Sequence, residues 1–593
     1  MLDKLRNSLN KYDIISFDIF DTLLIRPYAK PSNVFQHLEE MNSAIGFYAV
    51  RQIAENNLRK YKNIEYANYD EIYSVLPSDF QFLKEKELQL EKDTLYANPQ
   101  MKEIFDYAKS LNKRIILISD MYFSSDILDY ILKKNGFSGY EKIYISAEFK
   151  KAKYDAKLFK YILETLKIDP NKMLHIGDYE HSDYNCPRSL GIDAYLYTKP
   201  IEQLFINYPK IKIFFNENSE DLTCGIIIGI LLKRFIFNKS IDDYWTNFGY
   251  YIGGPLCYGI TKYVYDEIIK ENIKDIIFIA RDGYTIQKIF NLINNNKNIK
   301  DYYIYAQRSI NIIANMDYKN SNVWNYRIDT FINLFKELSE DLKNKCPKSF
   351  KNYEEKIDFI ENNKNIIEDI SKKIYSYYLE YISKFNIKNN KLAIFDTSAG
   401  SFNSMKLIGK VFNESKILGL YWLISSNEKD KFWCKSYQKD FQTSFLDYNI
   451  LELLITAPEL PVKYINENGD FVLIDNEYER IRAEAYKFIS EGEILFTKDL
   501  LKIFSNYEIK FNYITIIKLV NTFLYNAEEK DIKHFSDIKH GVNEDHTIYE
   551  PLIIYKQIKP TKINKLFCLY EDNQYKILYF LGIKITIKKD KRG

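Results

Sequence analysis

The chain has 593 residues and a mass of 70.6 kDa, which is too long for one hydrophobic core and long enough for two to four domains. Its 83 basic and 81 acidic side chains leave a formal net charge of +2. This near balance argues against a nucleic-acid-binding protein, which would carry a basic excess. With 46% hydrophobic and 28% charged residues, the composition is typical of a folded chain and excludes a disordered one.

The cysteines and the apolar runs predict the compartment. The six cysteines are widely spaced, which excludes a CxxC zinc or redox motif and favours a reducing environment. Residues 1–7 lack the apolar core of a signal peptide. The longest apolar run, Cys224 to Leu232, is shorter than the ~20 residues that a spanning helix needs. We therefore expect a cytoplasmic protein with no transmembrane segment.

Five short apolar runs in the first 200 residues predict the strands of a parallel sheet, because helical segments separate the last four. The runs are 13–17, 114–118, 142–146, 173–176 and 193–197. A helical block at about 34–108 separates the first two. The pattern ends at Lys199-Pro200, so we expect a first domain at 1–200.

A second α/β stretch follows an isoleucine-rich helix at about 224–237. Its predicted strands are 275–280, 301–305, 391–395 and 417–424, with a long helical region at about 320–385 and a hairpin around 466–469. We expect a second α/β domain at 205–480. A mostly helical extension at 481–593 would end in a short basic edge strand, in which lysine and threonine alternate with isoleucine over 583–588.

Reactive side chains follow most strands of the first domain, where parallel α/β sheets usually place their chemistry. In chain order they are Asp18, Ser119, Lys153, Asp178 and Asp183. A carboxylate nucleophile, a hydroxyl, an ammonium and a carboxylate pair for a divalent metal together predict phosphoryl transfer. The metal would be Mg²⁺, because every available ligand is an oxygen.

These motifs resemble, in order, the four motifs of the haloacid dehalogenase superfamily, which consists mostly of phosphatases. The segments that carry the resemblance are Phe17 to Leu24, Ile116 to Ser119, Ser146 to Phe159, and His175 to Asp183. The resemblance implies a Rossmann-like sheet with a helical cap at about 34–108. It also implies that Asp18 is the nucleophile, that Ser119 holds the phosphoryl group, and that Lys153 steadies the developing charge. Asp18, Asp178 and Asp183 would hold the metal.

One position departs from this family pattern. Phosphatases of the superfamily usually carry an aspartate two residues after the nucleophile, as general acid and base, but this chain has Phe20 there. Phe20 can offer only its backbone carbonyl to a metal. Asp21 follows, and it is either the replacement acid–base group or a turn-capping carboxylate. A dehalogenase would also lack that aspartate but would not need Asp178 and Asp183 as a metal pair; a degenerate scaffold is a third interpretation.

Five further side chains carry expectations of their own. His175 lies inside a predicted strand, so we interpret it as a hydrogen-bonded core histidine. The cap would select the substrate, and Arg51 is our candidate for a residue of its pocket. His540 and His546, like His534, recur at a spacing that fits no metal site, so we expect them at the surface.

The strand ends of the second stretch carry groups that bind anions. A Gly/Ser turn before a helix and arginines at neighbouring strand ends are suited to phosphate or carboxylate, which predicts a pocket for a phosphorylated or nucleotide-linked ligand. The residues are Arg281, Asp282, Arg308, Asp396, Ser398, Gly400 and Ser401. Ordinary loop capping with an Arg–Asp ion pair is the alternative, since no Walker or dinucleotide motif is present.

The order of these parts resembles predicted hydrolases of bacterial capsule and surface-polysaccharide assembly, some of which are labelled sugar transferases. The resemblance is carried by the first domain, by Ala280 to Tyr284, by Asp396 to Ser404 and by the basic end at 580–589. It implies a Mg²⁺-dependent phosphatase or phosphotransferase acting on a phosphorylated sugar or polyol. The alternative is a sugar or other group transferase in the C-terminal half, with the first domain auxiliary. Implied partners are a phosphorylated sugar or nucleotide sugar, other polysaccharide-assembly proteins, and the inner membrane face as a peripheral contact.

Overall fold

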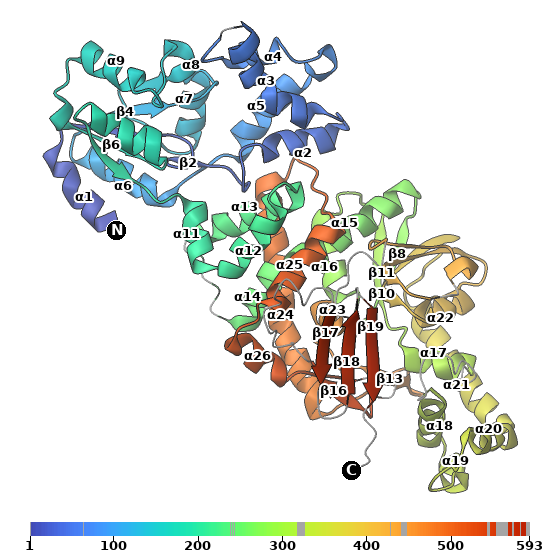
Figure 1. Ribbon diagram of the computed structural model, residues 1–593. Coiled ribbons are helices and arrows are strands. Elements are labelled where there is room, and N and C mark those ends of the chain that lie inside the picture. Colours follow the sequence, from blue (N-terminus) through green and yellow to red (C-terminus); the bar gives the residue numbers. More distant parts are fainter. Residues whose placement is uncertain are drawn as a thin grey trace.

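The structure is a computed structural model of the chain. It describes residues 2–62, 64–237, 239, 241, 243–316, 327–426, 429–439, 448–541, 546–552, 567–571, 575–580 and 583–588. Two parallel sheets and a connecting set of helices make up most of the described chain (Figure 1).

The first sheet has the five predicted strands, all parallel, in the order β5-β4-β1-β6-β7. They are β1 (Ile14–Phe17), β4 (Arg114–Ser119), β5 (Lys142–Ile145), β6 (Met173–Gly177) and β7 (Asp193–Leu196). The crossover helices include α6 (Pro99–Ser110), α7 (Ser125–Lys134) and α9 (Lys157–Leu166). Strand β1 is buried along its whole length. Because it pairs with β4 on one side and β6 on the other, its carboxyl end lies between the carboxyl ends of those two strands.

A helical cap interrupts the sheet between β1 and β4. It consists of α2 (Asn33–Asn42), α3 (Phe47–Lys62), α4 (Tyr69–Tyr73) and α5 (Leu83–Thr94). The chain leaves and returns through a two-stranded ribbon of β2 (Leu24–Ile25) and β3 (Tyr96–Ala97). The interval 34–108 predicted for the cap also includes most of α6, but α6 packs beside α1 (Leu2–Ser8) and β4 in the sheet domain.

Hydrogen bonds connect the cap to the second half of the chain. His37 in α2 contacts the backbone carbonyl of Glu508 through Nε2 at 2.8 Å and the Tyr28 hydroxyl through Nδ1 at 2.8 Å. The Tyr507 hydroxyl donates to Asp93 at 2.9 Å. Helix α13 (Leu222–Ile236) approaches so closely that a Cβ at Gly229 would lie 2.0 Å from a backbone carbonyl of the first domain.

The His37 contact predicts a stability that depends on pH. Burial lowers the pKa of His37 from 6.5 to about 4, so the unfolded chain binds a proton at pH values where the folded chain does not. The contribution of His37 to the free energy of unfolding is therefore complete above pH 6.5 and falls as the pH drops toward 4, by about 3 kcal/mol. His37→Gln should lack this part of the pH dependence in urea unfolding between pH 7 and 4, whereas His534→Gln should retain it. Parallel pH profiles for wild type and His37→Gln would contradict the prediction.

The second sheet is also parallel, with the order β12-β11-β10-β8-β9. Its strands are β8 (Asp275–Ile279), β9 (Lys300–Ile304), β10 (Lys391–Ala399), β11 (Lys416–Ile424) and β12 (Cys434–Ser436). The first four were predicted, whereas β12 is too short to give a sequence signal. Between β9 and β10 lie the helices α17 (Arg308–Asn315), α18 (Arg327–Leu338), α19 (Glu340–Lys345), α20 (Tyr353–Asn362) and α21 (Lys364–Ser383).

The domain boundary predicted at residue 480 is wrong, because it falls inside α24 (Glu477–Phe504). This helix packs along α15 (Gly254–Lys270) and α14 (Tyr244–Phe248) and reaches from the second sheet to the cap (Figure 1). Gly492 makes the contact possible, since a Cβ there would lie 2.1 Å from the Thr246 carbonyl. Residues 481–504 are therefore part of the core that joins the two halves.

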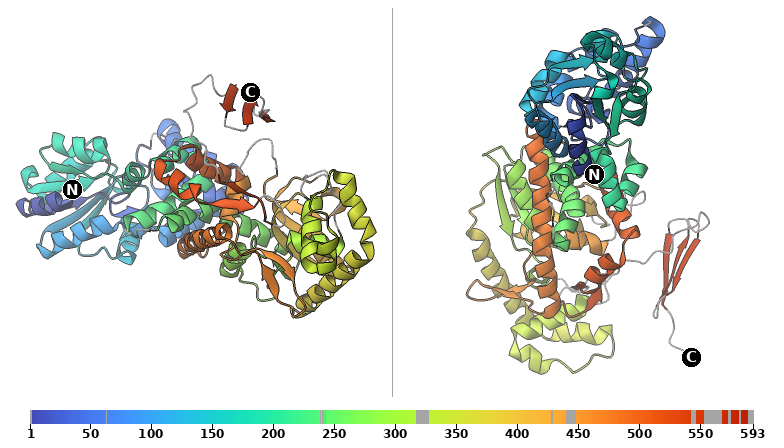
Figure 2. Two further views of the ribbon diagram at one scale, coloured as in Figure 1. Left: turned by 90° about the horizontal axis from the view of Figure 1, so that it is seen from below. Right: turned by 90° about the vertical axis from the view of Figure 1, so that its left-hand side faces the viewer.

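The end of the chain contains more strands than predicted. After α25 (Tyr513–Tyr525) and α26 (Glu529–Ser536), a ribbon pairs β15 (Lys539–Gly541) with β16 (Tyr549–Pro551). A three-stranded antiparallel sheet of β17 (Phe567–Glu571), β18 (Tyr575–Phe580) and β19 (Ile583–Lys588) stands apart in both views of Figure 2. The edge strand predicted at 583–588 is confirmed as β19; residues 581, 582 and 589 of the basic end lie outside the described residues.

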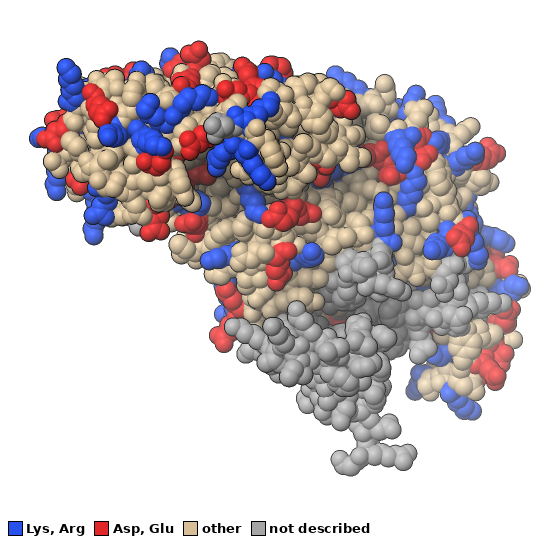
Figure 3. All heavy atoms as spheres, turned by 45° about the horizontal axis from the view of Figure 1, so that its top comes forward, with Lys and Arg blue, Asp and Glu red and all other residues tan. Residues whose placement is uncertain are grey.

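The predicted hairpin is present as β13 (Val462–Ile465) and β14 (Phe471–Leu473). Within the described ranges, the helices are all too short or too polar to cross a membrane. Basic and acidic side chains are interspersed on the face shown in Figure 3, in keeping with the near-zero net charge.

Candidate functional site

The carboxyl ends of β1 and β6 bring three carboxylates together. The Asp18 backbone N–H donates to the Ile176 carbonyl at 2.8 Å, which extends the pairing of the two strands to the nucleophile candidate. Asp178 directly follows β6, and Asp183 lies in the short π-helix Glu180–Asn185. Gly177 is needed there because a Cβ would lie 2.5 Å from the Asp183 carboxyl carbon.

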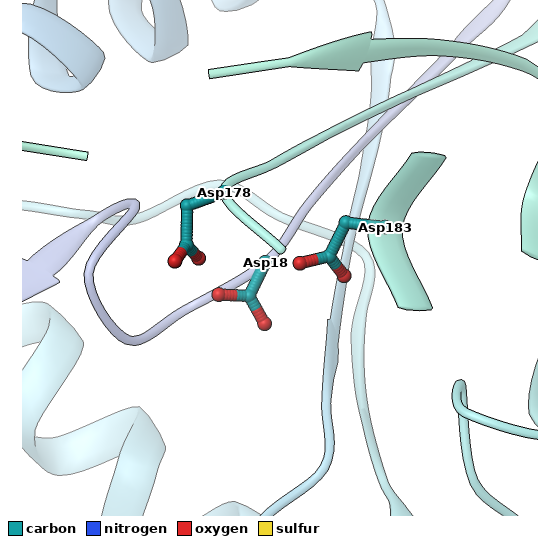
Figure 4. Close-up of side chains that lie close together, drawn as sticks. All are labelled: Asp18, Asp178 and Asp183. Carbon is teal, nitrogen blue, oxygen red and sulfur yellow. The ribbon is translucent and has the colours of Figure 1, made fainter. Parts of the chain in front are cut away.

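These three residues fit a divalent cation. One carboxylate oxygen of each lies within 4.8 Å of the others, and Asp18 and Asp183 are buried. Figure 4 shows the carboxyl groups of Asp178 and Asp183 on either side of that of Asp18. Burial, with the neighbouring charges of Asp21 and Asp183, raises the pKa of Asp178 to about 7. An all-oxygen set with this excess of negative charge suits Mg²⁺.

Lys153 is the cation that the chain itself supplies to this cluster. Its buried ammonium pairs with Asp18 and lies 2.6 Å from Asp183. The Asp120 carboxylate positions the Lys153 loop by accepting from the backbone N–H groups of Lys153 at 2.8 Å and Tyr154 at 3.2 Å. Asp120 was not among the predicted site residues, although its position directly after Ser119 at a strand end is a usable signal.

The other residues predicted for this site lie around the cluster. Ser119 ends β4 and is 2% exposed. His175 is buried and contacts Ser16 Oγ through Nδ1 at 2.8 Å and Asp183 through Nε2 at 3.2 Å, which confirms that it is a hydrogen-bonded core histidine. The Phe20 ring packs under the Arg26 guanidinium at 4.2 Å. Metal binding by the Phe20 carbonyl stays a prediction.

Asp21 occupies a strained turn beside the cluster. Its φ is +57°, and its backbone N–H donates to the Leu24 carbonyl at 2.8 Å. It lines a small cavity of about 220 Å³ together with Arg26, Lys30 and Lys199. Asp21 is close enough to Asp178 to raise its pKa. Its role as the replacement acid–base group stays a prediction.

The comparisons with known proteins find a family that resembles the first domain. A family model described as haloacid dehalogenase-like hydrolase matches residues 20–196. These residues form a haloacid dehalogenase-like hydrolase domain. The match begins two residues after Asp18 and ends at the last residue of β7.

Solved structures resemble the hydrolase domain at low sequence identity. A dehalogenase with an intermediate complex is 16% identical, covers 31% of this chain and 84% of its own, and has a TM-score of 0.25. An aspartate-to-alanine variant of a family enzyme from Bacteroides thetaiotaomicron, in complex with magnesium and inorganic phosphate, is 18% identical with coverages of 32% and 95% and a TM-score of 0.23. A predicted phosphoglycolate phosphatase from Haemophilus somnus is 14% identical with coverages of 32% and 86% and a TM-score of 0.25. No curated protein matches the chain.

Arg51 does not line a pocket of the cap. Its side chain is fully buried and makes a two-pronged ion pair with Glu87, at 3.0 and 2.8 Å. The guanidinium also lies 4.4 Å from the ring centre of Phe35 and 4.8 Å from that of Tyr122. Arg51 therefore holds the cap helices together, and the prediction that it lines a pocket is wrong.

The second group of predicted residues meets at the carboxyl edge of the second sheet. A cavity of about 560 Å³ is lined by all seven: Arg281, Asp282, Arg308, Asp396, Ser398, Gly400 and Ser401. Strand β10 continues to Ala399, so Asp396 and Ser398 belong to the strand and not to a turn as predicted. The turn follows at Gly400, and α22 (Asn403–Val411) begins after it.

Several lining residues of this cavity were missed because they come from distant elements. Glu479 and Arg482 lie on α24, and Arg327 begins α18. His546, expected at the surface, is mostly buried there and contacts Glu479 through Nδ1 at 2.8 Å. His534 packs on the ring of Tyr244 at 3.7 Å, and the side chain of His540 lies outside the described residues.

Proposed function

We propose that the hydrolase domain is a Mg²⁺-dependent phosphatase or phosphotransferase that uses Asp18 as its nucleophile. The observation that carries the proposal is the position of Asp18, with the Lys153 ammonium on it and the carboxylates of Asp178 and Asp183 within 4.8 Å. A carboxylate cluster that can hold a divalent cation is suited to phosphate chemistry. Dehalogenation, which the absence of an aspartate at Phe20 would also allow, has no use for Asp178 and Asp183.

In the proposed reaction a carboxylate oxygen of Asp18 attacks phosphorus, and the bond from phosphorus to the ester oxygen breaks. Water then attacks the aspartyl-phosphate, releases inorganic phosphate and regenerates Asp18. Lys153 fixes the Asp18 carboxylate and offsets the charge on the phosphoryl oxygens, while Ser119 donates its hydroxyl hydrogen to one of them. A Mg²⁺ ion held by Asp18, Asp178 and Asp183 would stabilise negative charge on the transferring group. Asp21 is the proposed donor of a proton to the leaving alcohol.

A small phosphorylated sugar or polyol is the proposed substrate class. The cavity of about 220 Å³ beside Asp21 supports a small anionic substrate, because Arg26, Lys30 and Lys199 contribute to its lining. Arg26 is already paired with Glu91 at 2.9 Å and Lys30 with Glu220. Lys199, which lies 4.0 Å from the nearest Glu202 oxygen, is therefore the cation best suited to contact a substrate. The role in surface-polysaccharide assembly rests on the sequence resemblance alone.

Removal of the metal should abolish the activity. Phosphate release from a panel of sugar phosphates should stop in EDTA and return with added Mg²⁺. Mg²⁺ with fluoroberyllate, a phosphoryl mimic, should raise the melting temperature, since a ligand at 100 times its Kd adds ~2.7 kcal/mol of stability. Asp178→Asn should lose most of this shift, whereas Asp169→Asn, on the exposed start of a turn before β6, should keep it. Full activity in EDTA would overturn the metal dependence.

A group transfer in the C-terminal half is a second candidate, favoured by the meeting of the seven predicted residues in one cavity. In such a reaction an acceptor hydroxyl forms a bond to the transferred sugar and gives its proton to the Asp282–Asp396 pair. The bond from the sugar to the donor phosphate breaks, and the phosphate leaves as an anion near Arg308. Consumption of a nucleotide sugar that is lost in Asp396→Ala would support this candidate.

A further inference from the structure

The cavity of the second sheet lies where α/β sheets bind ligands. From β8 the chain crosses to β9 on one side and then returns to β10 on the other side. The carboxyl ends of β8 and β10 therefore flank a topological switch point, the usual position of a ligand crevice in such sheets. Arg281 and Asp282 follow β8, and Asp396 lies near the end of β10.

Besides Arg482 on α24, three arginines line this cavity, and they come from three separate parts of the chain. Arg281 follows β8, Arg308 begins α17 after β9, and Arg327 begins α18. Guanidinium groups fixed on separate elements can bind more than one phosphate group, each through paired N–H donors. The hydroxyl groups of Ser398 and Ser401 line the same cavity and add further hydrogen-bonding groups.

The acidic side chains of the cavity are largely neutralised by protein groups. Burial opposes the charge on Glu479, but the hydrogen bond with His546 and the neighbouring Arg482 and Arg281 guanidinium groups hold its pKa well below the usual range. Arg482 donates to Glu479 at 2.8 Å and to the Glu459 carbonyl at 2.7 Å. Glu479 is thus satisfied without Arg281, whose nearest Glu479 oxygen is 3.9 Å away, beyond hydrogen-bonding distance.

Asp282 and Asp396 lie close together at the carboxyl edge of the second sheet. Burial, the Asp282 charge and a hydrogen bond between the two carboxyl groups raise the pKa of Asp396 to about 7, and Ser404 donates to Asp396 at 2.5 Å. Glu452 also lines the cavity, 3.9 Å from Arg308. Outside the cluster of Glu479, Arg482 and His546, the lining therefore has four basic side chains, Arg281, Arg308, Arg327 and Lys539, and three acidic ones, Asp282, Asp396 and Glu452.

Buried polar atoms without partners also line the cavity. Within the described part of the chain, Nε of Arg281 and both amide atoms of Gln307 have no hydrogen-bond partner. Arg281 has a φ of +72°, and its backbone N–H donates a hydrogen bond to the Tyr303 hydroxyl oxygen at 2.8 Å. Buried polar groups in proteins nearly always have partners, so these atoms indicate that a ligand completes the site after a small rotation of the side chains.

We propose that this cavity binds an organic ligand that carries a diphosphate group, with Arg281, Arg308 and Arg327 as the diphosphate-binding residues. A volume of about 560 Å³ exceeds the needs of a single ion and falls within the ~300–1,000 Å³ of small-molecule sites. The inference goes beyond the hydrolase proposal. It gives the ligand class for the group transfer named above as the second candidate. Binding of the diphosphate does not depend on that reaction.

Titration calorimetry of the full chain with inorganic pyrophosphate tests the proposal. The Asp18→Asn background and EDTA remove the reaction and the metal from the hydrolase domain. We expect one pyrophosphate per chain, bound at least 10-fold more tightly than inorganic phosphate. Arg308→Gln should weaken pyrophosphate binding at least 10-fold and leave the melting temperature unchanged, because the Arg308 side chain is 57% exposed. Arg281→Gln should weaken it by a similar factor.

Arg480→Gln is the matched control, because Arg480 lies on α24 but pairs with Asp475 outside the cavity. Its pyrophosphate affinity should equal that of the parent. Absence of binding, equal affinity for phosphate and pyrophosphate, or an affinity that Arg308→Gln leaves unchanged would each overturn the proposal. Binding without consumption of any nucleotide sugar would support the ligand site and contradict only the transferase candidate. Failure of phosphate release in the metal experiment would affect only the hydrolase proposal.

Discussion

Asp18→Asn should abolish the release of phosphate from every phosphate ester that the wild-type protein hydrolyses. An amide cannot form the aspartyl-phosphate, so the rate should fall by at least ~10³-fold. The substitution also replaces a carboxylate that pairs with Lys153. Lys153 keeps the Asp183 carboxylate at 2.6 Å as its ion-pair partner, so the variant should stay folded. Initial rates of phosphate release in Mg²⁺, together with melting curves of both proteins, measure the effect.

The control for this experiment is Asp126→Asn, an exposed aspartate in the first turn of α7. Its rate should match that of the wild type, which shows that the loss in Asp18→Asn is specific to the site. Equal rates for Asp18→Asn and the wild type would show that another nucleophile does the chemistry. Phe20 occupies the position at which phosphatases of the superfamily carry their acid–base aspartate. If the wild type releases no phosphate from any ester, the missing aspartate is the first explanation to test, and Phe20→Asp should then restore turnover.

Arg51→Leu should lower the free energy of unfolding by about 3–5 kcal/mol, because it leaves the Glu87 carboxylate buried without its cation. Both side chains are completely buried, and Glu87 otherwise contacts only hydroxyl groups, accepting from Tyr73 at 2.7 Å and from Tyr122 at 3.4 Å. The loss should arise in the cap, where Arg51 joins α3 to α5. Urea unfolding followed by tyrosine fluorescence and circular dichroism measures it.

Arg59→Leu provides the matched control, since Arg59 is exposed on the same helix. It should change the free energy of unfolding by less than ~0.5 kcal/mol. The double variant Arg51→Leu/Glu87→Leu should recover most of the loss, because no buried charge is left unpaired. A cap that tolerates Arg51→Leu without loss of stability, but with an altered ranking of substrates, would restore the interpretation of Arg51 as a pocket residue.

All strands of the two parallel sheets except β12, and the residues at their carboxyl edges, could be predicted from local sequence patterns. Buried parallel strands are short runs of isoleucine, leucine and phenylalanine between polar turns, and this signal is local to each strand. The side chain that follows such a run lies at the sheet edge whatever the rest of the chain does. For this reason Asp18 and Asp178 in the first sheet, and Arg281 and Asp396 in the second, could be predicted to share an edge.

The residues that complete these sites come from distant parts of the chain and could not be predicted in this way. From the sequence, Glu479 and Arg482 are ordinary positions of a long helix, and His546 is expected at the surface. In the structure, all three line the cavity of the second sheet, and His546 contacts Glu479. The role of Arg51 could not be predicted either. It is a basic residue in a cap helix, and its burial and ion pair depend on the packing of α5, which places Glu87 beside it. Packing between elements hundreds of residues apart depends on the summed fit of many side chains, and no single stretch of sequence contains that information.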